Sequence, residues 1–65
     1  MKFGLRVREM RLQKNVSQED LAHSAEIDRT YLQSIEKGKR NVSISTIEKI
    51  SKALNVSMET LIKNF

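Results

Sequence analysis

The chain of 65 residues contains no cysteine and no proline, and its only glycines are Gly4 and Gly38. Without cysteine it can form neither a disulfide framework nor a zinc site with thiolate ligands. The absence of proline and the scarcity of glycine favour an all-helical chain with short connections. No apolar run is long enough to span a membrane or to form the core of a signal peptide, so we expect a cytoplasmic protein.

Groups that carry catalysis are also missing. The only histidine, His23, has no cysteine to share a metal with, and one histidine does not make a metal site. The sequence shows no pair of nucleophile and base, no phosphate-binding glycine loop and no constellation of catalytic carboxylates. We therefore predict that the protein is not an enzyme and uses neither a cofactor nor a metal.

The length of the chain limits its core. We expect residues 1–65 to form one small domain, which is only marginally stable unless something supports it. Because disulfides and thiolate metal sites are excluded, dimerisation is the support that remains. The formal net charge of +4 is weak evidence for a polyanionic partner.

Three places in the sequence carry the same signal for the start of a helix. Each has a polar residue that can cap the first turn, an apolar residue directly before it and another four positions after it. The caps are Ser17, Asp28 and Ser57. A cap side chain accepts from a free amide of the first turn, while the apolar pair holds the entering chain against the helix. The first two signals predict two short helices in quick succession.

Hydrophobic spacing completes an all-α prediction of five helices, at about 3–14, 18–25, 29–37, 44–54 and 58–63. The fourth helix is expected to bury Ile44, Ile47, Ile50 and Leu54. Its cap is Ser43 or Ser45, since Ser45 with Glu48 matches a capping box. The fifth helix carries an apolar stripe that so small a domain cannot bury completely. We expect this stripe to divide between the core and a dimer interface, formed by Met58, Leu61, Ile62 and Phe65.

The predicted helix at 29–37 has two distinct faces when its residues are placed at about 100° intervals. Its apolar face holds Tyr31, Leu32 and Ile35. The opposite face is a run of hydrogen-bond donors without a carboxylate, formed by Arg29, Thr30, Gln33, Ser34 and Lys37. Two interpretations fit this face: a solvated helix surface, or side chains that hydrogen-bond base edges in the major groove of DNA.

The distribution of charge favours the second interpretation. The segment 29–40 holds four basic residues against one acidic residue, Glu36. Four acidic residues cluster directly before it, at Glu19, Asp20, Glu26 and Asp28. The positive charge is therefore placed where phosphates would be. The expected phosphate contacts are Lys37, Lys39 and Arg40.

The chain resembles the lambda-repressor-like, Xre-type helix-turn-helix family over nearly its whole length. The resemblance is carried by the segments SQEDLA (17–22), DRTYLQSIEKGKRN (28–41) and SISTIEKISKALNVSMETLI (43–62). Within that family, DRTY followed by IEKGKRN is most similar to the controller proteins of restriction-modification systems. The resemblance implies a compact fold of five helices, with the helix-turn-helix at the second and third and a twofold dimer built by the end of the chain.

The resemblance also implies roles for individual residues. Gln18 would contact a phosphate, and the base-facing positions would be Arg29, Thr30, Gln33 and Ser34. In the controller subset the positions of Tyr31, Arg40 and Asn41 also approach DNA, although Tyr31 fits a core aromatic with a solvated hydroxyl equally well. Arg11 and Glu36 occupy positions where related repressors pair an arginine with a glutamate as scaffold. Glu26 departs from the pattern, because many members carry glycine in this turn and a left-handed backbone there would be strained.

We therefore predict a transcriptional regulator that binds double-stranded DNA as a homodimer, at a pseudo-palindromic operator, with each recognition helix in one of two successive major grooves. The resemblance implies an autoregulatory controller of a restriction-modification system that works in the cytoplasm, associated with the nucleoid. We expect neither membrane binding nor a small-molecule effector. Phage-type repressors, antitoxins and, from a different class, protein-interaction modules remain as alternatives.

Overall fold

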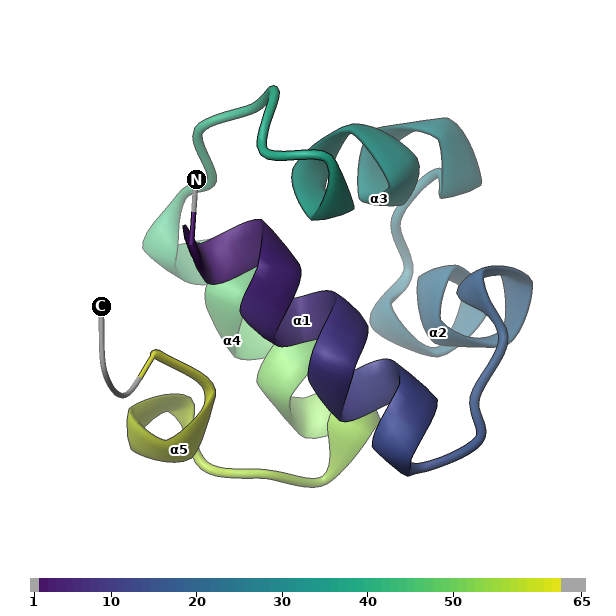
Figure 1. The fold of residues 1–65 in the computed structure, drawn as a ribbon, viewed down its shortest axis with the longest axis vertical. Helices are drawn as coiled ribbons and strands as arrows, with labels where there is room; N and C mark the ends of the chain where they lie inside the picture. Colours follow the sequence, from purple (N-terminus) through teal and green to yellow (C-terminus); the bar gives the residue numbers. More distant parts are fainter. Residues whose placement is uncertain (1, 63–65) are drawn as a thin grey trace.

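The computed structural model of the protein describes residues 2–62, and within this range it is built from helices without a strand. The helices are α1 (Lys2–Gln13), α2 (Gln18–Ala25), α3 (Arg29–Glu36), α4 (Ile44–Leu54) and α5 (Met58–Ile62) (Figure 1). This confirms the all-α prediction of five helices, with boundaries that agree to within one residue. Lys63, the expected last residue of the fifth helix, lies outside the described residues.

Three of the connections share one design. Each begins with a residue in the left-handed conformation, at Asn15, Glu26 and Asn55, where φ is 57°, 58° and 58°. A half-buried apolar residue follows, and the third residue caps the next helix. The caps are those predicted from the sequence: Ser17, Asp28 and Ser57 each accept a first-turn amide at 3.0 Å. The left-handed residue ends one helix, and the cap two positions later starts the next. These short connections therefore fix sharp angles between successive helices.

The connection between α3 and α4 is longer and starts at Gly38, whose φ is 75°. The amide of Gly38 donates to the carbonyl of Ile35 at 2.9 Å, and that of Lys39 donates to Ser34 at 3.0 Å. Together these two bonds end α3 in a Schellman motif, as expected for a glycine just past a helix end. The cap of α4 is Ser43, which accepts the amide of Thr46 at 3.1 Å, so the capping box at Ser45 does not form.

The helices enclose one core. Helix α1 runs across the molecule and packs against α3, α4 and α5, while α2 packs against α3 and α4 (Figure 1). The buried apolar residues are Phe3, Val7, Met10, Leu21, Ala22, Ala25, Leu32, Ile35, Ile50, Leu54 and Leu61. None of the helices within residues 2–62 is both long and apolar enough to cross a membrane.

One predicted core residue is wrong. Ile44 is 75 % exposed. The side of α4 that meets the core is formed by Ile50, Ser51 and Leu54, with Ile47 half-buried beside them. Ile44 lies six residues before Ile50, which places it about 120° around the helix from that residue, outside the core-facing side.

Gly4 has a role that the sequence did not reveal, because it allows α1 and α3 to touch at their backbones. A methyl group added at Gly4 would overlap the carbonyl oxygen of Ile35 in the last turn of α3. The carbonyl carbon of Ile35 would lie only 3.0 Å from the same methyl group. The N-terminal part of α1 therefore sets how close α3 can come, and glycine is the residue that permits this approach.

We expect Gly4→Ala to destabilise the protein by about 1–3 kcal/mol, because α1 and α3 must separate to admit the methyl group. We expect this net loss even though alanine stabilises a helix interior by about 1 kcal/mol relative to glycine. Thermal unfolding measures the effect, since each kcal/mol moves the Tm of a domain of this size by about 4–8 °C. Arg8→Ala, at an exposed position of the same helix, is the control and should change stability little. A Gly4→Ala protein as stable as the control would contradict the close packing of α1 on α3.

Glu26 offers a change in the opposite direction. Its backbone is left-handed, with φ 58° and ψ 43°, which costs a residue with a Cβ about 1–2 kcal/mol relative to the right-handed region. Glycine removes this strain but makes the unfolded chain more flexible, which costs about 0.4–1 kcal/mol. We expect Glu26→Gly to raise the free energy of unfolding by about 0.5–1 kcal/mol.

Urea unfolding measures this gain. Asn15→Gly is the matched comparison, because asparagine tolerates the left-handed region and should gain less. A loss of stability in the Glu26→Gly protein would show that the turn is not strained.

Candidate nucleic-acid interface

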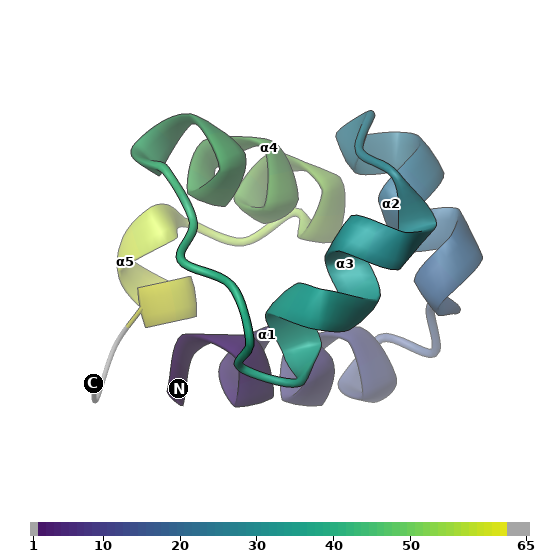
Figure 2. The ribbon, with the colours of Figure 1, turned by 90° about the horizontal axis from the view of Figure 1, so that it is seen from above.

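Helices α2 and α3 and the turn between them form the helix-turn-helix predicted from the sequence. The turn consists of Glu26, Ile27 and Asp28, and the amide of Ile27 donates back to the carbonyl of Ala22 at 3.0 Å. The apolar face of α3 is buried through Leu32 and Ile35, which are 0 % and 1 % exposed. Seen from above, α3 lies between α1 and α2 and turns its other face outward (Figure 2).

The outward face of α3 carries the side chains expected to read bases. Arg29 and Thr30 at its first turn are exposed, and Gln33 and Ser34 one turn later are half-buried. Lys37 is exposed directly after the helix. The only carboxylate in α3, Glu36, is 4 % exposed and points into the molecule. The solvent therefore meets a surface of hydrogen-bond donors and positive charge.

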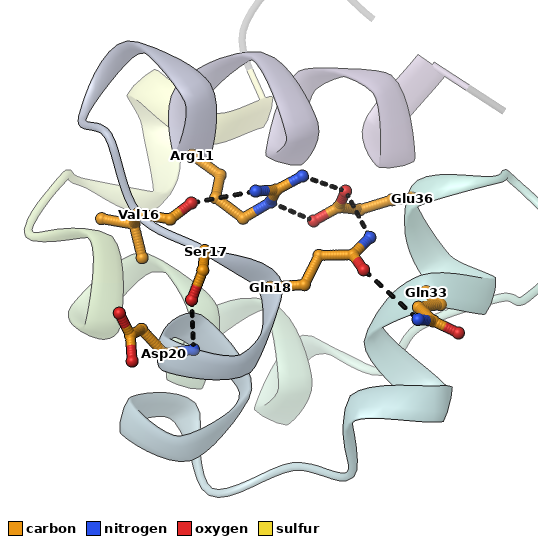
Figure 3. A network of polar contacts seen from close by, with 7 residues as sticks. All are labelled: Arg11, Val16, Ser17, Gln18, Asp20, Gln33 and Glu36. Atoms are coloured by element: carbon orange, nitrogen blue, oxygen red, sulfur yellow. Dashed lines mark hydrogen bonds and ion pairs between the residues drawn. The ribbon is translucent and has the colours of Figure 1, made fainter.

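Glu36 is withdrawn from this surface by Arg11 of α1. The guanidinium binds the carboxylate with two hydrogen bonds, Nε to Oε2 at 2.9 Å and Nη2 to Oε1 at 3.1 Å (Figure 3). Arg11 also donates from Nη1 to the carbonyl of Val16 at 2.9 Å, just before α2. The side chains of Arg11 and Glu36 are 9 % and 2 % exposed. The pair predicted as scaffold thus ties α1, the start of α2 and the end of α3 together.

Gln18 extends this network toward the outward face. Its Nε2 donates to Glu36 Oε1 at 3.2 Å, and its Oε1 accepts from Nε2 of Gln33 at 3.4 Å (Figure 3). Gln18 was expected only as a phosphate contact and Gln33 only as a base contact. The sequence contained no sign that the two amides meet, because they come from different helices whose angle is set by tertiary packing.

The loop after α3 presents the remaining predicted contacts. Lys39, Arg40 and Asn41 are all exposed. The guanidinium carbon of Arg40 lies 5.9 Å from the ring centroid of Tyr31, within range of a cation–π contact. Tyr31 is half-buried and packs against the core, so it serves as a platform for Arg40 at the edge of the donor surface.

The apolar stripe of α5 is divided between the core and the surface, as expected. Leu61 is 0 % exposed, so its assignment to the dimer interface is wrong: it fills the core of its own protomer. Met58 is half-buried, and Ile62 is 42 % exposed. Phe65 lies outside the described residues. Arg6 of α1 donates to the carbonyl of Thr60 at 3.2 Å, which helps to hold the short helix α5 in place.

The outward face of α3 and the loop that follows it expose hydrogen-bond donors and basic groups. Within residues 2–62, no three histidine, aspartate or glutamate side chains come together as a metal site would require. The chain belongs to the helix-turn-helix family, whose model matches residues 7–61. This confirms the resemblance found in the sequence, and proteins of this class are DNA-binding regulators of transcription rather than enzymes.

The chain is similar to control proteins over nearly its whole length. It is 54 % identical over 61 residues to the control protein C.BamHI of Bacillus amyloliquefaciens, covering 92 % of this chain and 75 % of that protein. It is 44 % identical over 62 residues to the control protein C.MunI of a Mycoplasma species, covering 94 % and 84 %. The crystal structure of the restriction-modification controller protein C.AhdI from Aeromonas hydrophila is 44 % identical, with a TM-score of 0.91 over 94 % of this chain and 92 % of that one.

The buried pair gives a stability prediction. We expect Arg11→Met to lower the free energy of unfolding by about 3–5 kcal/mol, because it leaves the buried Glu36 carboxylate without its partner. Arg11→Met combined with Glu36→Leu should recover most of this loss, since neither charge is then buried alone. Urea unfolding of the single and double variants measures the difference. A double variant no more stable than Arg11→Met would mean that the unpaired charge is not the cause.

Proposed function

We propose that the protein is a sequence-specific DNA-binding regulator of transcription, with α3 as the helix that enters the major groove. The observation that carries this proposal is the composition of the outward face of α3. It holds Arg29, Thr30, Gln33 and Ser34, while the helix's only carboxylate is buried against Arg11. An exposed carboxylate there would repel phosphates and compete for the donors. Its burial leaves groups that can hydrogen-bond base edges.

Each contact has a distinct task in this proposal. Arg29 is placed to donate two hydrogen bonds to guanine, and Thr30 to meet the methyl group of thymine. Lys37, Lys39, Arg40 and Asn41 flank α3 and would bind the phosphates, with Arg40 supported on Tyr31. Gln18, at the start of α2, would contact a phosphate of the DNA backbone. Phosphate contacts raise affinity for any sequence, whereas base contacts select among sequences.

The functional unit would be a homodimer with twofold symmetry. Two recognition helices then enter successive major grooves about 34 Å apart and read a pseudo-palindromic operator. The exposed Ile62 and half-buried Met58 of α5 offer apolar area for the interface. Such an interface uses the same surface on both protomers.

The relatives support a biological setting for this activity. Two control proteins and the restriction-modification controller protein C.AhdI match 92–94 % of the chain at 44–54 % identity. We infer that the protein controls the genes of such a system, including its own, by occupying promoter DNA. It would then work in the cytoplasm, associated with the nucleoid.

Selection from a pool of random duplex DNA tests this function. The wild-type chain should enrich a palindrome with half-sites one helical turn apart. Arg29→Ala should flatten the preference at one position by about 1–3 kcal/mol, because a bidentate base contact is lost. Lys39→Ala should weaken binding to all sequences alike and reduce the salt dependence by about one phosphate contact.

Two outcomes would contradict the proposal. Binding that disappears as salt rises, without enrichment of any sequence, would mean that the surface serves another partner. Equal loss of sequence preference in the Arg29→Ala and Lys39→Ala proteins would reject the division between base and phosphate contacts.

A further inference from the structure

The buried pair determines the direction of every hydrogen bond between Arg11 and the outward face of α3. A guanidinium can only donate and a carboxylate can only accept. Glu36 Oε1 already accepts from Arg11 at 3.1 Å, and its contact with Gln18 at 3.2 Å must therefore use the NH2 group of the glutamine. The opposite orientation would bring the amide oxygen of Gln18 against the carboxylate. Burial of Glu36 makes that repulsion costly.

The fixed orientation of Gln18 passes to Gln33. With its NH2 group on Glu36, Gln18 turns its Oε1 toward α3, where it accepts from Nε2 of Gln33 at 3.4 Å. Gln33 must donate in this contact, because its own oxygen would repel that of Gln18. A free glutamine exchanges oxygen and nitrogen by a half turn, but Gln33 has one of its two N–H groups committed inward (Figure 3).

We propose that this relay makes Gln33 selective for adenine over guanine. The relay leaves Gln33 with one oxygen and one N–H for DNA, which is the pair that matches adenine, whose N6 donates and whose N7 accepts. Guanine presents two acceptors, N7 and O6, and is best served by two donors. Gln18 and Glu36 are therefore positioning residues for a base contact that neither makes itself. The inference rests on the proposed function.

The test compares binding to the selected operator with binding to its single-base variants. Gln33→Ala first identifies the base position that depends on Gln33. The wild-type chain should bind an operator with adenine at this position about tenfold or more tightly than one with guanine. Glu36→Gln removes the acceptor-only group at the head of the relay, so Gln18 and Gln33 can turn, and the preference should fall below about threefold.

A second variant and a control keep the test decisive. Gln18→Met breaks the relay without burying a new charge, and it should relax the same position even if Glu36→Gln lowers stability too far for measurement. If Gln18 contacts a phosphate, Gln18→Met will also weaken binding to every sequence. This general loss cancels in the ratio of the affinities for the adenine and guanine operators. The control is Glu19→Gln, which removes one negative charge as Glu36→Gln does, but at an exposed position next to Gln18. It should leave the adenine preference intact.

The relay would be overturned if Gln33→Ala changed the base preference at no operator position. It would also be overturned if the wild-type chain preferred guanine at the position that depends on Gln33, or if the adenine preference there were unchanged in the Gln18→Met protein. A wild-type chain that enriches no operator at all is a different result, because it would remove the proposed function itself.

Discussion

The buried pair of Arg11 and Glu36 is the interaction on which the placement of the outward face of α3 depends. Two charges with 9 % and 2 % exposure lose most of their hydration, and their attraction compensates only when every donor and acceptor is used. Here the guanidinium binds both carboxylate oxygens and the carbonyl of Val16, while Gln18 adds a further donor to the carboxylate. The pair therefore joins three helices by bonds with defined directions, which a purely apolar contact could not supply.

The backbone constraints around the pair determine where α3 lies. Gly4 lets α1 approach the last turn of α3 at backbone distance, and the short turn through Glu26 fixes the start of α3 relative to α2. Both ends of α3 are thus held while its outward face stays accessible. A rigid helix loses little conformational entropy when it enters a groove, so such support favours discrimination between sequences.

Apart from the pair of Arg11 and Glu36, which the family resemblance implied, the features that the sequence predicted are those that depend on neighbours in the chain. The caps at Ser17, Asp28 and Ser57 follow from contacts within a few positions, so they could be predicted from the local sequence. The predictions that Ile44 is buried and that Leu61 lies in a dimer interface were wrong, because the packing of the other helices decides which side of a helix is buried. The role of Gly4 and the bond between Gln18 and Gln33 depend on the distance between helices, which no local pattern carries.

The central claim is that the outward face of α3, held by the buried pair, is the surface that meets DNA. Amide chemical shifts of the isotopically labelled chain, followed as its selected duplex is added, test this most directly. We expect the largest changes along α3, at the start of α2 and at residues 39–41, with little change on the outer side of α1, where Leu5 and Leu12 are exposed. Changes centred on α1 or confined to α5, with α3 unaffected, would contradict the account.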